Sequence, residues 1–99
     1  MARFAIQFSS QALNHLKFFA KRDQRVLMDA IQVHLLTYPD QPTRKRKKLE
    51  ENDLAPWELR VGDFRVFYDI DVENRVVIVV AVGKKNHNLL HIAGKEVHL

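Results

Sequence analysis

Residues 57–85 read WELRVGDFRVFYDIDVENRVVIVVAVGKK, and this stretch predicts three consecutive antiparallel strands. The first, Trp57–Val61, alternates apolar and polar side chains, and Gly62-Asp63 then supplies the two loop residues of a type II′ hairpin. Phe64–Asp71 is expected to form the second strand. Residues 75–83 form the third, and their run of valine, isoleucine and alanine is typical of a strand that is buried on both faces.

The position of this turn decides which residues face each other across the first hairpin. On one side of the sheet the opposed pairs are all apolar, namely Val61 with Phe64, Leu59 with Val66, and Trp57 with Tyr68. The other side carries Glu58, Arg60, Arg65, Phe67 and Asp69. A slip of one residue would mix the two sets, so the pattern specifies the register.

In this register Arg60 and Arg65 lie directly opposite each other on the polar side. Two like charges in such a pair cost stability unless something negative lies between them. In one interpretation both side chains extend into water or are neutralised by Glu58 or Asp69. In the other they form an anion site, for which phosphate is a well-matched ligand. On an open sheet face Arg65 would contribute little core area and would not be needed for folding.

Two helices are predicted before this sheet. Residues 3–8 alternate as a short strand, and Ser9 or Ser10 is suited to cap a helix over residues 11–20. A second helix, which ends before Pro39, is predicted by an apolar stripe of period 3.6 that consists of Val26, Leu27, Ala30, Ile31, Leu35 and Tyr38.

These elements predict one α+β domain over residues 1–99. The helices form a hairpin on one face of the sheet, because an apolar sheet face needs a covering layer. The sheet is expected to be four-stranded and mainly antiparallel, with the strand of residues 3–8 added to the three strands of residues 57–83. The expected core consists of Phe8, Leu13, Leu16, Leu27, Ile31, Leu35, Leu59, Val66, Tyr68, Ile78 and Val80.

The composition indicates a folded chain with excess positive charge. Hydrophobic residues make up 46% of the chain, which excludes intrinsic disorder, and the formal net charge of +4 suits an anionic partner such as nucleic acid, the ribosome or an acidic protein segment. The chain has no cysteine, and no apolar run is long enough for a signal peptide or a membrane span. We therefore expect a cytoplasmic protein that has no membrane association, disulfide or thiol chemistry.

The most basic stretch is residues 44–48, which read RKRKK. Such a run is either a solvated face or a contact to a phosphate backbone, and the acidic residues at 50, 51 and 53 would partly screen its field. Towards the end of the chain, His87 and His91 have the i, i+4 spacing of metal ligands on a helix. No cysteine and no H-E-x-x-H motif completes such a site, so we expect neither a metal nor another cofactor.

The motif W-x-L-R-V-G-D-F-R-V-F-Y-D-I-D, followed by V-V-I-V-V-A-V-G-K-K, resembles the RelE/ParE superfamily of bacterial type II toxin–antitoxin toxins. Chain length and the order of elements also fit, so the resemblance extends over nearly the whole chain. It implies a toxin that is neutralised by a cognate antitoxin, whose amphipathic segment is expected to fold over the basic groove. Toxin and antitoxin together would form a hetero-oligomer that binds operator DNA.

The RelE-like toxins of this superfamily cut mRNA on the ribosome without a metal. As the resemblance implies, the ribose 2′-oxygen attacks the adjacent phosphorus, and a 2′,3′-cyclic phosphate remains. The reaction needs a base for the 2′-hydroxyl proton, an acid for the leaving 5′-oxygen, and cations for the charge on the phosphoryl oxygens.

The resemblance also assigns expected roles in catalysis. Arg65 matches the phosphate-binding arginine, Arg60 a position that is often basic, and Lys85 a position that is commonly arginine. His91 falls near a C-terminal tyrosine or histidine, and Glu58 stands where the best-known pattern has lysine, so these two would form an acid–base pair. Contacts to mRNA and ribosomal RNA are expected from Arg44, Lys45, Arg46, Lys47, Lys48, Lys84, His87 and Phe67.

Three functions stay open at this point. A ribosome-dependent mRNA endoribonuclease that inhibits translation is favoured by the cationic face of Arg60, Arg65 and Lys85. A ParE-like toxin would instead bind DNA gyrase and need no catalytic residues, and an inactive homologue would only bind its antitoxin. The departures from the nuclease pattern at Glu58 and His91 keep the second and third functions open.

Overall fold

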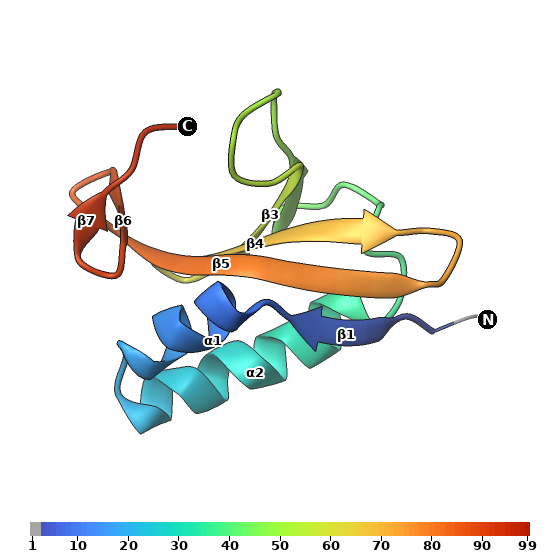
Figure 1. The fold of residues 1–99 in the computed structure, drawn as a ribbon, viewed down its shortest axis with the longest axis horizontal. Helices are drawn as coiled ribbons and strands as arrows, with labels where there is room; N and C mark the ends of the chain where they lie inside the picture. The colour runs from blue at the N-terminus through green and yellow to red at the C-terminus, as the bar shows by residue number, and fades with distance from the viewer. Residues whose placement is uncertain (1–2) are drawn as a thin grey trace.

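The computed structural model describes residues 3–99, which form one sheet with two helices packed against one of its faces (Figure 1). This arrangement confirms the α+β class and the helical hairpin. The elements in chain order are β1 (Ala5–Phe8), α1 (Ser10–Lys17), α2 (Lys21–Leu35), β2 (Arg46–Lys48), β3 (Trp57–Val61), β4 (Phe64–Asp71), β5 (Val76–Asn86), β6 (Leu89–Ile92) and β7 (Lys95–Glu96).

The sheet is larger than expected, because it has seven strands within residues 3–99 instead of four. Strands β2 to β7 lie side by side in chain order and are antiparallel, whereas β1 runs parallel to β5. The additional strands are β2, which comes from the basic run, and the β6–β7 hairpin at the C-terminal end. Strands of two to four residues are too short to show a clear alternation of apolar and polar side chains, so the sequence did not predict them. They form by pairing with a longer neighbouring strand.

The first hairpin has the register that the sequence predicts. Val61 pairs with Phe64, and the three pairs of apolar residues and the Arg60–Arg65 pair are all present. Gly62 has a φ of +58°, and Asp63 is not among the residues of positive φ, as expected for a type II′ turn. The alternation of side chains and the turn chemistry therefore specify the same structure.

Strand β5 contains a bulge, where Val80 is an extra residue in the ladder with β4. The helix-facing positions change there from odd to even numbers, so Val79 and Val82 both belong to the main core. The prediction that Ile78 is a core residue is wrong, since it is only half-buried. Val80 is also half-buried, but it packs against the smaller cluster around Phe67 and not against the main core. A continuous apolar run shows no alternation from which the faces of a strand can be assigned.

The main core lies between the helices and the sheet. The prediction is confirmed for Leu16, Leu27, Ile31, Leu35, Leu59, Val66 and Tyr68. Phe8 is half-buried and packs against this core. Leu13 was predicted to be buried but is 47% exposed, because Ala12 and Leu16 form the inner face of α1 and Leu13 lies beside that row.

A second, smaller core covers the centre of the other sheet face. Phe67 is completely buried there together with Ala55, Ala81, Leu90 and Ile92. The predictions that this face is open and that Phe67 contacts RNA are therefore wrong. The cover comes from β6 and from the loop before β3, and the alternation within β3 and β4 says nothing about either segment.

Two side chains tie α1 to the bulge in β5. Ser9 accepts a hydrogen bond from the N–H of Ala12 (3.0 Å), which caps the helix, and its hydroxyl donates to the carbonyl of Val80 (3.1 Å). His15 Nδ1 accepts a hydrogen bond from the N–H of Val82 (3.2 Å). The neutral form of His15 is therefore part of the contact between helix and sheet, and burial lowers its pKa below the ordinary value.

We expect the folded state to lose stability between about pH 7 and pH 5 because of His15. Its pKa is about 6.5 in an unfolded chain and lower in the folded one, so the unfolded state binds more protons in this range. The contribution is present above the unfolded pKa and is lost as the pH falls towards the folded pKa. Urea unfolding at pH 7 and at pH 5 should show a smaller decrease in the free energy of unfolding for His15→Gln than for the parent. Equal decreases would contradict this assignment.

Candidate functional site

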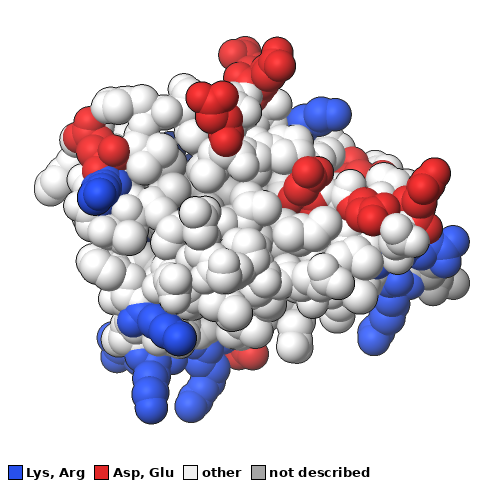
Figure 2. Space-filling view, viewed as in Figure 1, with Lys and Arg blue, Asp and Glu red and all other residues white. Residues whose placement is uncertain are grey.

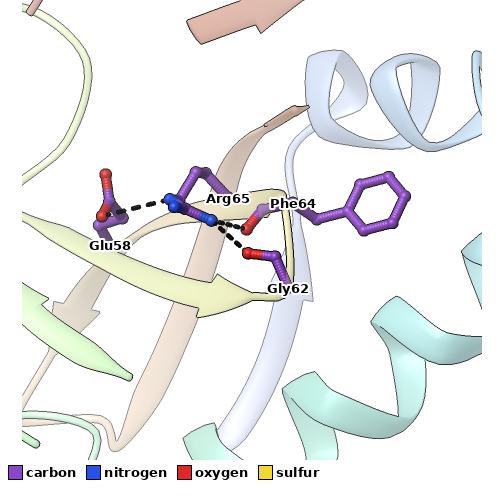
Figure 3. Close-up of polar contacts among 4 residues, drawn as sticks. All are labelled: Glu58, Gly62, Phe64 and Arg65. Atoms are coloured by element: carbon purple, nitrogen blue, oxygen red, sulfur yellow. Dashed lines mark hydrogen bonds and ion pairs between the residues drawn. The ribbon is translucent and has the colours of Figure 1, made fainter. Parts of the chain in front are cut away.

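Arg65 on β4 and Glu58 on β3 form a buried ion pair (Figure 3). Arg65 Nε lies 3.7 Å from Glu58 Oε1, and the two residues are 5% and 8% exposed. Arg65 Nη1 also donates to the carbonyls of Gly62 (2.7 Å) and Phe64 (2.8 Å). The guanidinium therefore braces the hairpin turn, and the prediction that Arg65 stands half-exposed on an open face is wrong.

The charge of Arg65 is largely balanced inside the protein. Burial lowers the pKa of its guanidinium, Glu58 opposes this change, and Arg60 lowers the pKa further. An arginine keeps its proton at neutral pH despite such shifts. Arg65 Nε has no hydrogen-bond partner among the described residues, because its nearest carboxylate oxygen is too distant. The pair thus acts mainly through charge, and Arg65 has little access to a phosphate.

Arg60 and Lys85 lie on the same sheet face as this pair, away from the helices. Arg60 belongs there because it is paired with Arg65. Lys85 follows the bulge in β5, after which the even positions, including Val82, face the helices. Arg60 is exposed and Lys85 is half-buried. The cationic face that the sequence predicts is thus assembled, but only two of its three members reach solvent.

His91 does not join this group. It is paired with Lys84, which lies on the helix-facing side with its ammonium group 5.4 Å from the centre of the Phe64 ring. Its Nδ1 lies 3.1 Å from the carbonyl oxygen of Leu89. The structure therefore places His91 and Glu58 on opposite sides of the sheet, and the acid–base pair that the sequence suggested is not assembled.

A different histidine, His98, lies near Glu58. A hollow of about 230 Å³ is lined by Glu58, Lys85, Asn88, Leu89, Leu90, Val97, His98 and Leu99. His98 Nε2 lies 2.7 Å from Glu96 Oε2, which orients the ring. Sequence reasoning missed His98 because it follows the last patterned strand. The available signal was Val97, an apolar residue that packs on the second core and so folds the end of the chain back over the sheet.

The basic run divides into structural and exposed members. Arg46 donates from Nε to the carbonyl of Gln41 and from Nη1 to that of His34, both at 2.9 Å. Lys48 lies over the ring of Trp57, 5.9 Å from its centre. Lys48 is nonetheless exposed, as are the remaining three residues of the run, Arg44, Lys45 and Lys47. The run is therefore a weaker candidate for RNA contact than its five adjacent charges suggest.

Acidic side chains border the face that carries Arg60 and Lys85. Glu50, Glu51 and Asp53 are exposed in the loop before β3, and Figure 2 shows carboxylates where this loop projects at the top of Figure 1. Glu50 and Glu51 line one further hollow and Glu51 and Asp53 line another, and both share Leu99 with the hollow beside Glu58. A polyanion that approaches this face therefore meets negative as well as positive charge.

Two sequence features have a limited structural counterpart. His87 is exposed in the turn between β5 and β6, so its four-residue spacing from His91 does not have the geometry of a helix. Among residues 3–99, no group of three histidine, aspartate or glutamate side chains is arranged to hold a metal ion. Neither of the described helices combines the length and apolar composition that crossing a membrane requires.

The fold is similar to that of solved toxin–antitoxin proteins. A chain of the toxin–antitoxin complex RelBE2 from Mycobacterium tuberculosis matches with a TM-score of 0.69 and 21% identity, covering 86% of this chain and 94% of that one. A chain of the RelE–RelB complex from Pyrococcus horikoshii OT3 matches with a TM-score of 0.66 and 23% identity, covering 88% and 99%. At such identities the likeness establishes a shared RelE-like α+β fold.

A match to a family model assigns the chain to a particular family of toxins. The model described as the ParE toxin of the type II toxin–antitoxin system parDE matches residues 6–89, which run from within β1 to the first residue of β6. The chain therefore belongs to the ParE toxin family, within the RelE/ParE superfamily. A comparison with curated proteins found no significant match.

Proposed function

We propose that this toxin arrests growth by binding a protein target, DNA gyrase, without a catalytic step of its own. The observation that supports this best is the buried pair of Arg65 and Glu58. The arginine that a RelE-like nuclease would use on phosphate here braces a turn and is balanced by a carboxylate. A toxin that acts by binding needs no free cation at this position.

The chemistry of phosphoryl transfer makes this argument quantitative. Loss of one donor to the developing charge typically costs about 3 kcal/mol of transition-state stabilisation, which is roughly a hundredfold or more in rate. Arg65 is withdrawn from such a role, and Glu58 adds a negative charge to the same face. The acidic loop residues beside it further weaken the field that an RNA phosphate would need.

The proposal includes a cognate antitoxin, as in the two toxin–antitoxin complexes of similar fold. An apolar groove of about 450 Å³ between β1 and α2 offers a surface for an amphipathic segment, and it is lined by Ile6, Phe8, Met28, Ile31, Gln32 and Leu36. Binding of operator DNA by the resulting hetero-oligomer belongs to the same proposal. Co-purification with the product of an adjacent reading frame is the direct test.

A second candidate function is a ribosome-dependent mRNA endoribonuclease, and one observation favours it. Glu58, Lys85 and His98 line a single hollow. In that function one of Glu58 and His98 would take the proton of the 2′-hydroxyl and the other would protonate the leaving 5′-oxygen. Lys85 would stabilise the charge on the phosphoryl oxygens while the 2′-oxygen forms the cyclic phosphate.

The two functions differ in what the double variant Lys85→Ala/His98→Ala does. If the toxin only binds gyrase, induction of this variant should arrest growth within about twofold of the parent, and plasmid supercoiling should fall in both. If the toxin is a nuclease, the variant should lose on the order of a hundredfold in cleavage. Mapping of mRNA 5′ ends after induction measures the second outcome directly.

A matched control removes the same residue types from outside the hollow. Lys47 and His87 are both exposed, and neither lines the hollow. The variant Lys47→Ala/His87→Ala should therefore arrest growth as the parent does, and any loss of cleavage should be far smaller than that of Lys85→Ala/His98→Ala. Breaks within translated codons that disappear only in Lys85→Ala/His98→Ala would overturn the gyrase proposal in favour of the nuclease.

A further inference from the structure

The turn between α1 and α2 carries a basic and aromatic surface, whose residues 17–22 neither candidate function uses. Lys17 ends α1, Lys21 and Arg22 begin α2, and all three are exposed. Between them Phe18 is 61% exposed, which is unusual for a large aromatic side chain. Figure 2 shows basic side chains gathered at the lower left, where Figure 1 places this turn.

Packing brings one further cation, Lys84, to the same end of the molecule. The Phe18 ring is 6.0 Å from that of Phe19, which lies 5.1 Å from that of Phe64, and Lys84 Nζ lies over Phe64. On its other side Phe18 adjoins Gly94, where an added Cβ would lie 3.3 Å from Phe18 Cζ. We call the group of Lys17, Phe18, Lys21, Arg22 and Lys84 the turn surface.

Three cations stand against a single carboxylate, that of Asp23, within residues 17–23. Within residues 3–99, none of the four cations of the turn surface lies within ion-pair distance of a carboxylate. Two of them occupy the first turn of α2, where the helix dipole makes positive charge unfavourable. Asp23 in the same turn offsets only part of this charge, and Ala20 provides no side-chain cap. Residues that break the rules of stability without local compensation are typical of functional surfaces.

From this arrangement we infer that the turn surface binds single-stranded nucleic acid. Lysine and arginine side chains contact the phosphates, and the exposed ring of Phe18 stacks on a base. A base must be unpaired to reach such a ring, which favours a single strand over a duplex. An acidic peptide would use the cations but would gain nothing specific from a flat aromatic face. The inference does not depend on whether the toxin acts on gyrase or on mRNA.

Fluorescence anisotropy with the full-length chain tests this inference. The probes are labelled 12-mers of oligo(U) RNA and oligo(dT) DNA, a 12-base-pair duplex, and a polyglutamate peptide of equal charge. The parent should bind both single strands more tightly than the duplex and the peptide, with an affinity that falls as salt rises. Phe18→Ala should weaken single-strand binding about tenfold, and Phe18→Leu should do the same while keeping apolar contact with Gly94.

A charge-matched pair of variants separates this surface from general basicity. The slope of the logarithm of the binding constant against the logarithm of the salt concentration measures the number of phosphate contacts. Lys17→Gln/Lys21→Gln/Arg22→Gln should lower the magnitude of this slope by about 2, since each phosphate contact to a single strand contributes about 0.7. Arg44→Gln/Lys45→Gln/Lys47→Gln removes the same charge from exposed positions of the basic run and should lower the slope by clearly less than the first triple variant does. Equal effects of the two triple variants, no effect of Phe18→Ala, or tighter binding of the duplex or of polyglutamate would each overturn the inference. A preference for RNA over DNA or the reverse identifies which single strand is bound, and either supports it.

Discussion

Arg65→Ala should destabilise the fold by about 3 kcal/mol, because it leaves Glu58 buried without its partner. Removal of one member of a buried ion pair costs about 3–5 kcal/mol, and the lower end applies here since the 3.7 Å contact is not a hydrogen bond. The carbonyls of Gly62 and Phe64 lose their donor as well. For a chain of this size the thermal midpoint should fall by more than 10 °C, as measured by circular dichroism.

Two companion variants separate charge from structure at this position. Glu58→Gln/Arg65→Met removes both charges and keeps the volume, so it should recover most of the lost stability. Arg65→Lys keeps the charge but cannot reproduce the planar donor group, so it should recover only part. An Arg65→Ala protein as stable as the parent would show that the guanidinium is dispensable for folding, and would return Arg65 to the role of a phosphate ligand.

The fold could be predicted where two independent signals agreed. In the first hairpin, the alternation of side chains and the Gly62-Asp63 turn specify the same register, and the structure has that register. The second helix was predicted for a similar reason, since its apolar stripe and Pro39 agree on its extent. Its end was placed too late, because α2 ends at Leu35 and Tyr38, the last residue of the predicted stripe, is 52% exposed. Agreement between local pattern and turn chemistry leaves few alternatives for the chain.

The candidate site was harder to predict because it depends on which segments cover the sheet. Arg65 lies on the polar side of β4, and a pattern of alternation cannot tell a solvated polar side from one that is covered. The cover comes from short segments without periodicity, namely β6 and the loop before β3. The same limitation explains the misplacement of Phe67 and His91, and the omission of His98 from the expected site. Register identifies the residues that share a face, but only tertiary packing decides their exposure.

Gly83→Ala should destabilise the C-terminal hairpin by about 2–3 kcal/mol, which makes it the second large effect. A Cβ at Gly83 would lie 2.7 Å from the carbonyl oxygen of His91 and 2.8 Å from Ile92 Cγ1. The first of these is a backbone atom, so it cannot turn aside as a side chain would. Strand β6 would have to move away from β5, and overpacking of this kind typically costs about 1–3 kcal/mol.

Movement of β6 would also uncover the second core, because Leu90 and Ile92 pack beside Phe67. We therefore expect faster amide hydrogen exchange in residues 89–92 as well as a lower urea midpoint, while α2 keeps its protection. Gly62→Ala is the matched control, since nothing lies within 4 Å of its Cβ and its positive φ alone costs about 1 kcal/mol. If Gly83→Ala lowers the free energy of unfolding by no more than Gly62→Ala does, then β6 can move away from β5 at little cost in stability. The hollow formed by Glu58, Lys85 and His98 would then rest on a mobile hairpin, and the nuclease candidate would lose the fixed geometry that general acid–base catalysis needs.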